Sequence, residues 1–296
     1  MNNNKKVSIL VTTFNRADKV CKAIDSALAQ TYKCEVVVVD HGSTDKTPEV
    51  IKKYGRKIKY IRKDEDFGPH FSWLDGILHC NGEFIHIQHD DDWINPTFIE
   101  ECMNLFNKDV GCVFSNAELV NLKTNDLIVQ CNFKKKYKTG VYNNKLLEKK
   151  LMQYNVISPS CCIYRKSDLM DSIIQGKIPL KSNKVYHGVG SDVFMMLLSM
   201  LRYKNFGYVN KALAYFGIHD NSITVDAQKD KDRAKKINDA YNMVKVYYFG
   251  LKHIQKNMKK YEEKLKNTDV INLKYILKFR FITKPLTELI KKLKKI

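Results

Sequence analysis

Three consecutive carboxylates, Asp90–Asp92, follow an apolar stretch at residues 83–88 and are the sharpest chemical feature of the sequence. Negative charges this close together repel one another, and a bound cation relieves the repulsion. Carboxylate oxygens are ligands for Mg²⁺ or Mn²⁺, which complete their coordination with water and substrate phosphates. The alternative is a solvated acidic loop ahead of a helix, because Asn95 and Pro96 are helix-start residues. The position at the end of an apolar strand favours a divalent-cation site.

Two more polar loops are expected beside these carboxylates, at residues 12–16 and 40–46. Residues 7–11 and 35–39 are β-branched apolar runs typical of buried strands, and residues 18–30 have apolar positions at helical spacing. Strands that alternate with helices over short connections predict a mostly parallel sheet flanked by helices. Because ligands bind such sheets at the carboxyl ends of the strands, the three loops should meet at one edge.

The remaining elements follow from the same patterns. We expect strands at 58–61, 83–88, 112–114 and 161–164, and a short strand pair at 207–209 and 212–216. Helices are expected at 71–78, 95–106 and 192–201. The composition changes to Lys, Asn and helical spacing near residue 226, which predicts one unit at 1–225 and a helical, basic, amphipathic extension at 226–296.

Three segments, at residues 7–16, 36–45 and 82–93, resemble in order and spacing the opening motifs of the family 2 glycosyltransferases. The resemblance continues weakly to about Thr224. It implies an inverting, metal-dependent enzyme with the GT-A fold, a Rossmann-like α/β arrangement. In that fold residues 1–110 would form the donor half and 111–225 the acceptor half. It also implies a nucleotide-sugar donor, with UDP expected, and a glycan or lipid-linked glycan as acceptor in cell-surface polysaccharide synthesis.

The resemblance also implies roles for individual residues. Asp40 matches the acid that hydrogen-bonds the nucleobase, and Asp91 matches the metal ligand of the Asp-x-Asp signature. Asp90 would lie near the ribose and sugar, while His89 stands where Asp is common and is not assigned to the metal. The implied donor-binding residues are Thr12, Thr13, Phe14, Asn15, Arg16, Asp40, Asp90 and Asp91. The implied ligands of Mn²⁺ or Mg²⁺ are Asp91, Asp92 and His219.

Asp192 resembles the family's catalytic base and follows Ser191 at a predicted helix start. A carboxylate there also has a structural explanation, because it complements the positive end of a helix. His219 matches a residue of the family's closing segment and could equally be structural. Gly217 stands where the family commonly has Arg, and Trp73 is interpreted as ordinary core.

The formal net charge of +19 is concentrated at the C-terminal end. From Lys229 onward there are 20 Lys/Arg and 7 Asp/Glu residues, which leaves a net of +13. Apolar positions at Leu286, Leu289, Ile290 and Leu293 form a stripe beside a lysine-rich face. Such a helix binds an anionic membrane surface through residues 270–296, or packs on the enzyme or on a second subunit of a homo-oligomer. Both alternatives stay open.

Other functions explain the sequence less well. A nucleotidyltransferase would place a Gly-rich phosphate loop after the first strand, whereas residues 12–16 contain no glycine. Nucleic-acid binding through the basic tail leaves the carboxylate loops unexplained. The eight cysteines lack Cys-x-x-Cys spacing and are expected to be free thiols, with Cys161 and Cys162 on opposite faces of a strand. Without a signal-peptide pattern at the start, we expect a cytoplasmic protein, or a peripheral one at the inner membrane face.

Overall fold

A computed structural model describes residues 5–131, 137–153, 157–173, 189–219 and 230–266 of the 296-residue chain. The chain divides into two compact units, residues 1–248 and 249–296. The predicted boundary near residue 226 lies outside the described residues, as does the amphipathic stripe at 286–293. Within the described ranges, no helix is long and apolar enough to cross a membrane.

One mixed sheet of ten strands organises the first unit, in the order β3-β2-β1-β4-β9-β6-β10-β5, with β7 beside β6 and β8 beside β10. Strands β1 to β4 run parallel to one another, and β6 and β10 form a second parallel pair. Strand β9 runs antiparallel between them. The strands are β1 (Val7–Thr13), β2 (Cys34–His41), β3 (Lys59–Lys63), β4 (Phe84–His89), β5 (Asp92–Ile94), β6 (Val110–Asn121), β7 (Leu127–Cys131), β8 (Gly140–Asn143), β9 (Cys162–Arg165) and β10 (Asn205–Ile218).

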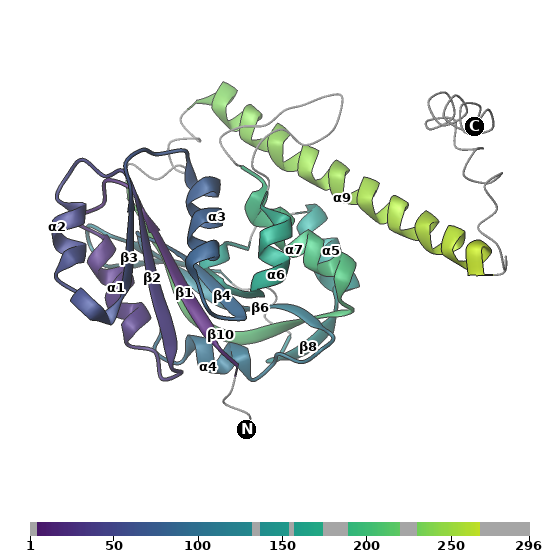
Figure 1. The fold of residues 1–296 in the computed structure, drawn as a ribbon, viewed down its shortest axis with the longest axis horizontal. Coiled ribbons are helices and arrows are strands. Elements are labelled where there is room, and N and C mark those ends of the chain that lie inside the picture. The colour runs from purple at the N-terminus through teal and green to yellow at the C-terminus, as the bar shows by residue number, and fades with distance from the viewer. Residues whose placement is uncertain (1–4, 132–136, 154–156, 174–188, 220–229, 267–296) are drawn as a thin grey trace, which may run out of the picture. The chain divides into compact units, whose positions relative to one another are not determined.

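Helices cover both faces of this sheet, as Figure 1 shows. On one face, the ring of His86 in β4 contacts the ring of Phe98 in α4 at a tilted angle, and Gln88 donates to the carbonyl of Ala23 in α1. On the other face, Leu10 of β1 lies directly under Gly76 of α3. The helices are α1 (Val20–Leu28), α2 (Thr47–Lys52), α3 (Pro69–His79), α4 (Phe98–Met103), α5 (Asn144–Gln153), α6 (Lys166–Ser172), α7 (Ser191–Arg202) and α9 (Lys231–Lys266), with short 3-10 turns η1 (Gly55–Lys57) and η2 (Pro159–Cys161).

The core strands follow the sequence pattern because their β-branched residues are buried on both faces. Val36 to Val39 of β2 are each 5% exposed or less, as expected of a strand covered by helices on either side. The predicted mostly parallel sheet flanked by helices is therefore present.

Three local predictions were wrong. The expected strand pair at 207–216 is one long strand, β10, whose register on β6 shifts between Val209 and Ala212. The helix expected from Asn95 begins at Phe98, because Asn95 accepts a hydrogen bond from the backbone of Thr97 and forms the preceding turn. Cys161 and Cys162 do not point to opposite faces: their Sγ atoms lie 3.9 Å apart, because Cys161 ends a 3-10 turn rather than belonging to β9. The seven cysteines whose side chains the structure describes, which are all but Cys131, are free thiols, as predicted.

The first part of α9, up to Tyr248, belongs to the first unit. Ala240, Val244 and Tyr248 recur at helical spacing and are each 2% exposed or less. Tyr248 donates to Glu148 of α5 over 3.2 Å, and the ring of Tyr247 packs on Phe194 of α7. This segment is therefore part of the folded core.

Candidate active site

The strand register brings the predicted polar loops to one edge of the sheet. Thr12 of β1 pairs with Val39 of β2 on one side and with His89 of β4 on the other. Asp40 and Asp90 each come one residue later along their strands. The edge thus contains the end of β1, the end of β2 and the carboxylate run, as the strand-end argument predicted.

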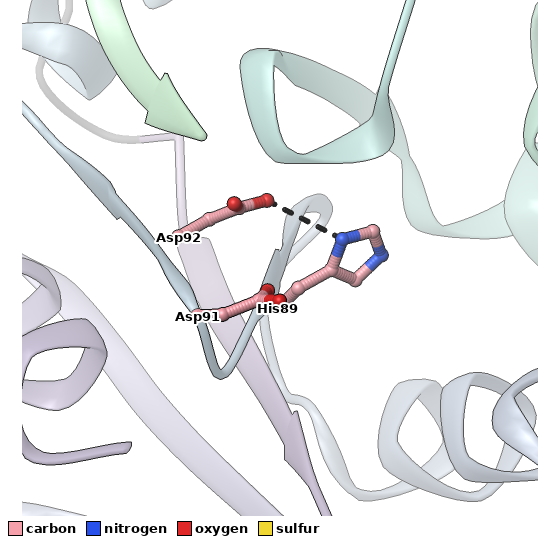
Figure 2. Close-up of side chains that lie close together, drawn as sticks. All are labelled: His89, Asp91 and Asp92. Atoms are coloured by element: carbon pink, nitrogen blue, oxygen red, sulfur yellow. Dashed lines mark ion pairs between the residues drawn. The ribbon is translucent and has the colours of Figure 1, made fainter. Parts of the chain in front are cut away.

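His89, Asp91 and Asp92 form a compact cluster at this edge. Each offers one ligand atom, and these atoms all lie within 4.8 Å of one another. The His89 Nδ1 and an Asp92 carboxylate oxygen are 3.3 Å apart, and Figure 2 shows the two side chains directed at each other. Asp92 is held in place by β5, which pairs antiparallel with the end of β10. His89 was not assigned to the metal from the sequence, and the structure places it inside the cluster.

The end of β10 completes the cluster from the opposite side. His219 follows this strand, and its Nε2 lies 3.0 Å from an Asp91 carboxylate oxygen. The backbone N–H of Gly217 donates to Asp92 over 3.2 Å. A Cβ atom on Gly217 would lie 2.3 Å from the Asp91 carbonyl oxygen, so only glycine allows the two backbones to approach this closely. A side chain at position 217 would therefore require one of the two backbones to move.

The ionisation of the cluster reflects concentrated negative charge. Burial lowers the pKa of His89, but its contact with Asp92 and the charges of Asp90 to Asp92 outweigh burial and raise the pKa to about 9. Burial and the neighbouring Asp91 charge raise the pKa of Asp90 to about 6. A cation relieves such a charge excess, and the carboxylate oxygens of this cluster suit Mn²⁺ or Mg²⁺. The donor atoms present therefore fit a divalent cation.

The loop after β1 contacts the carboxylates through its backbone. Phe14 N–H donates to the Asp90 carboxylate over 3.3 Å, and the Arg16 guanidinium lies 3.8 Å from the same side chain. Asn15 has a left-handed backbone, with φ 53°, and its side-chain oxygen accepts from the backbone of Thr44. Asn15 thus ties the loop after β1 to the loop after β2, which gives it a positioning role of its own.

Asp40 lies at the same edge but faces inward and is fully buried. One oxygen accepts from the backbone of Ser43 over 3.0 Å, and the other accepts from the Tyr60 hydroxyl over 2.9 Å. The Arg62 guanidinium is 3.7 Å from the second oxygen. The structure gives Asp40 three partners within the protein, and its contact with a nucleobase stays a prediction.

Asp192 lies at the first turn of α7, at the predicted helix start. One carboxylate oxygen accepts from the backbone of Val193 over 2.9 Å, and the other accepts from the Tyr241 hydroxyl over 2.9 Å. Burial raises the pKa of Asp192, while the Tyr241 hydrogen bond and the positive charge of His89 lower it in part. The role of Asp192 beside the carboxylate cluster stays a prediction.

Four residues of this region were not assigned from the sequence. Trp73 of α3 stacks on His89, with ring centroids 5.9 Å apart and planes 14° apart, so it supports the cluster rather than serving only as core. Tyr60 and Arg62 share one face of β3 because they are two residues apart. Once β3 is paired with β2, this spacing predicts that both side chains lie near Asp40. Tyr241 lies far along the chain from Asp192 and has no local signal.

Comparison with known families agrees with this geometry. The family model described as glycosyl transferase family 2 matches residues 8–172, more than half of the chain. The chain belongs to glycosyl transferase family 2. The family match agrees with the mixed sheet flanked by helices and supports a GT-A fold.

Sequence relatives cover only part of the chain. An uncharacterized glycosyltransferase of Rickettsia typhi is 40% identical over 126 residues, which is 41% of this chain and 39% of the relative. A cholesterol galactosyltransferase of Borreliella burgdorferi is 25% identical over 213 residues, covering 69% of this chain and 58% of the relative. The match therefore spans less than two thirds of either relative's length.

Solved structures share the fold at low identity. Residues 1–349 of TarS from S. aureus, crystallised with UDP-GlcNAc, align with a TM-score of 0.55 and 20% identity over 73% of this chain and 60% of that one. The mannosyltransferase PcManGT from Pyrobaculum calidifontis, in complex with GDP-Man and Mn²⁺, aligns with a TM-score of 0.50 and 15% identity over 90% of this chain and 81% of that one. Both neighbours bind nucleotide-sugars.

Proposed function

We propose that this enzyme transfers a sugar, with inversion, from a UDP-sugar to a hydroxyl group of a glycan or lipid-linked glycan in cell-surface polysaccharide synthesis. The observation that carries the proposal is the cluster of His89, Asp91 and Asp92 at the carboxyl edge of the sheet, and Asp192 at the start of α7 is the proposed second part of the site. Leaving-group stabilisation and proton removal are the two tasks of such a transfer, and the two parts of the site suit one task each.

Asp91 and Asp92, with His219 beside Asp91, are the residues that would hold the divalent cation. When bound, the cation acts as a Lewis acid that stabilises the departing diphosphate. Among these ligand candidates Asp91 is the most accessible carboxylate, since its side chain is 21% exposed and that of Asp92 is 8% exposed. Asp91 would therefore face the donor, and Asp92 would hold the cluster in place.

Asp192 would act as the general base. Its carboxylate removes the proton of the acceptor hydroxyl as that oxygen bonds to the anomeric carbon and the bond to the donor diphosphate breaks. Attack from the side opposite the diphosphate inverts the anomeric centre. Both Asp192 oxygens accept hydrogen bonds in the structure, and a carboxylate oxygen can accept a second one, so the acceptor hydroxyl can still bind.

The loop after β1 would bind the donor nucleotide. Thr12, Thr13, Phe14, Asn15 and Arg16 line the edge next to Asp90, and Arg16 supplies a positive charge near the expected diphosphate. Asp40 would contact the base only if it exchanges one of its internal partners. UDP is proposed because the similar TarS fragment was crystallised with UDP-GlcNAc, whereas PcManGT was crystallised with GDP-Man, so GDP-sugars are the necessary comparison.

The test is a panel of UDP- and GDP-sugars incubated with the protein and either Mn²⁺ or Mg²⁺, in which released nucleoside diphosphate is measured. Slow hydrolysis of at least one UDP-sugar, dependent on the cation and lost in Asp192→Asn, is the expected result. Release from GDP-sugars alone would overturn the UDP proposal. Absence of both release and binding for every donor would overturn the proposed function.

A lipid-linked acceptor would place the enzyme at the inner face of the cell membrane. The similar Borreliella enzyme is named for a lipid acceptor, cholesterol, and the net charge of +13 from Lys229 onward suits an anionic surface. Binding through residues 270–296 is the membrane version of this proposal, and contact with a second subunit is the alternative.

A further inference from the structure

Helix α9 packs against the start of α7 at the point where the proposed base lies. Gly190, the residue before α7, has a left-handed backbone with φ 99°. A Cβ atom there would lie 2.5 Å from the Val244 side chain and 3.5 Å from the Ala240 carbonyl oxygen. The missing side chain at Gly190 thus lets α9 approach the first turn of α7 closely.

This close approach brings one polar side chain of α9 to Asp192. The Tyr241 hydroxyl donates to an Asp192 carboxylate oxygen over 2.9 Å, and the two residues are 49 positions apart in the chain. Ala240 and Val244, on the same face of the helix, are each 2% exposed or less and hold this part of α9 in place. The packing of α9 therefore holds the Tyr241 hydroxyl in place beside Asp192.

We propose that Tyr241 is a positioning residue for the catalytic base, so that the beginning of α9 is part of the active site. The inference rests on the proposed role of Asp192. A hydrogen bond from a hydroxyl to a carboxylate fixes the rotamer of the acid and favours its charged form. Tyr241 thus holds Asp192 oriented and deprotonated toward the acceptor hydroxyl.

The ionisation of both partners agrees with this arrangement. The Tyr241 hydrogen bond lowers the pKa of Asp192 against the effect of burial. In return, burial and the Asp192 carboxylate raise the pKa of Tyr241, which keeps its hydroxyl protonated as a donor. His89 of β4 is a charged group that acts on Asp192 from another element, and its charge lowers the pKa of Asp192.

The chain offers a matched control for the alternative that Tyr241 only helps to dock the helix. Tyr248 lies two turns further along α9, is buried, and likewise donates its hydroxyl to a carboxylate, Glu148 of α5. Tyr241→Phe and Tyr248→Phe each remove one such hydroxyl from the same helix. Only the first acts on Asp192.

The experiment compares wild type, Tyr241→Phe and Tyr248→Phe in cation-dependent hydrolysis of the best UDP-sugar, with donor affinity measured separately by calorimetry. We expect Tyr241→Phe to lower kcat about tenfold with donor affinity unchanged, and to move the acid side of the kcat–pH profile to higher pH. Tyr248→Phe should lower thermal stability but keep the wild-type profile.

Each outcome separates the inference from the proposed function. If wild type hydrolyses a UDP-sugar and the two variants have the same kcat and the same pH profile, Tyr241 only docks the helix and the inference is wrong. If Tyr241→Phe changes donor affinity rather than kcat, a role through Asp192 is also excluded. If wild type releases no nucleoside diphosphate from any donor, the proposed function is wrong, and the inference that rests on it is wrong with it.

Discussion

At the scale of single residues, the site divides between groups that would meet the substrate and groups held by the protein itself. Asp91 and Asp192 keep partial exposure, whereas Asp40 is fully buried. Aspartate thus has two different roles in this region. Asp40 braces the loop after β2, and the exposed carboxylates are available for chemistry.

Asp40→Ala should destabilise the protein by about 3 kcal/mol, because it leaves the buried Ser43 N–H and the Tyr60 hydroxyl without their acceptor. Urea unfolding measures the change in the free energy of unfolding. Asp126→Ala, at an exposed turn, is the control and should change it by less than about 0.5 kcal/mol. Equal stability of the two variants would mean that the Asp40 network contributes little.

The proposed role of Asp192 as a base predicts how kcat depends on pH on the acid side. Burial raises its pKa above the ordinary 3.8, and a base works only when deprotonated, so kcat should fall as the pH is lowered through that raised pKa. The pH of half-maximal kcat on the acid side should therefore lie above 3.8. Asp192→Asn should bind donor normally at every pH and turn over at none. Retained turnover would remove Asp192 from the mechanism.

At the scale of elements, the edge depends on how the end of β10 meets the carboxylate run. The sequence predicts the ends of β1, β2 and β4 because each has a continuous apolar run before its polar loop. It does not predict that β10 pairs with β5 and brings Gly217 and His219 to Asp91 and Asp92. That pairing joins residues more than a hundred positions apart, and no local pattern encodes it.

The residues that support the site also lack a local signal in the sequence. Trp73 has the burial expected of core, and only its stacking on His89 shows its place in the site. Tyr60 and Arg62 act on Asp40 through the register between β2 and β3, which periodicity alone leaves open. The start of α9 was assigned to a separate extension because its composition is basic, yet Ala240 and Val244 are core residues.

Gly217→Ala tests the contact between β10 and the carboxylate run. Its Cβ would lie 2.3 Å from the Asp91 carbonyl oxygen, so the backbone of one segment must move. Cation-dependent donor affinity should fall at least about tenfold, because Asp91 shifts from its place in the cluster. The control is Gly140→Ala in β8, where the nearest atom would be 3.8 Å away. Unchanged donor affinity in Gly217→Ala would mean that Asp91 tolerates the shift.

At the scale of the whole molecule, the basic C-terminal end is divided between the two units. From Lys229 onward the net charge is +13, and residues up to Tyr248 belong to the first unit. Residues 249–296 form the second unit and hold most of that charge. The membrane and the subunit alternatives make opposite predictions for this end of the chain.

Deletion of residues 274–296 should abolish binding to vesicles that contain anionic lipid while leaving donor hydrolysis intact, because each Lys or Arg near the surface contributes about 1 kcal/mol. Vesicle co-sedimentation measures the binding, and vesicles of neutral lipid serve as the control. Sedimentation velocity on the same two proteins reports the oligomeric state. Unchanged vesicle binding with a smaller assembly would favour the subunit contact and refute the membrane version.

Binding of the donor diphosphate should depend on a divalent cation that Asp91 holds. Calorimetric titration of a UDP-sugar into the protein, with and without Mn²⁺, measures this directly. We expect Mn²⁺-dependent binding in wild type and in the surface control Asp126→Asn, and none in Asp91→Asn. Equal donor affinity with and without Mn²⁺, or Mn²⁺-dependent binding that survives in Asp91→Asn, would contradict the account.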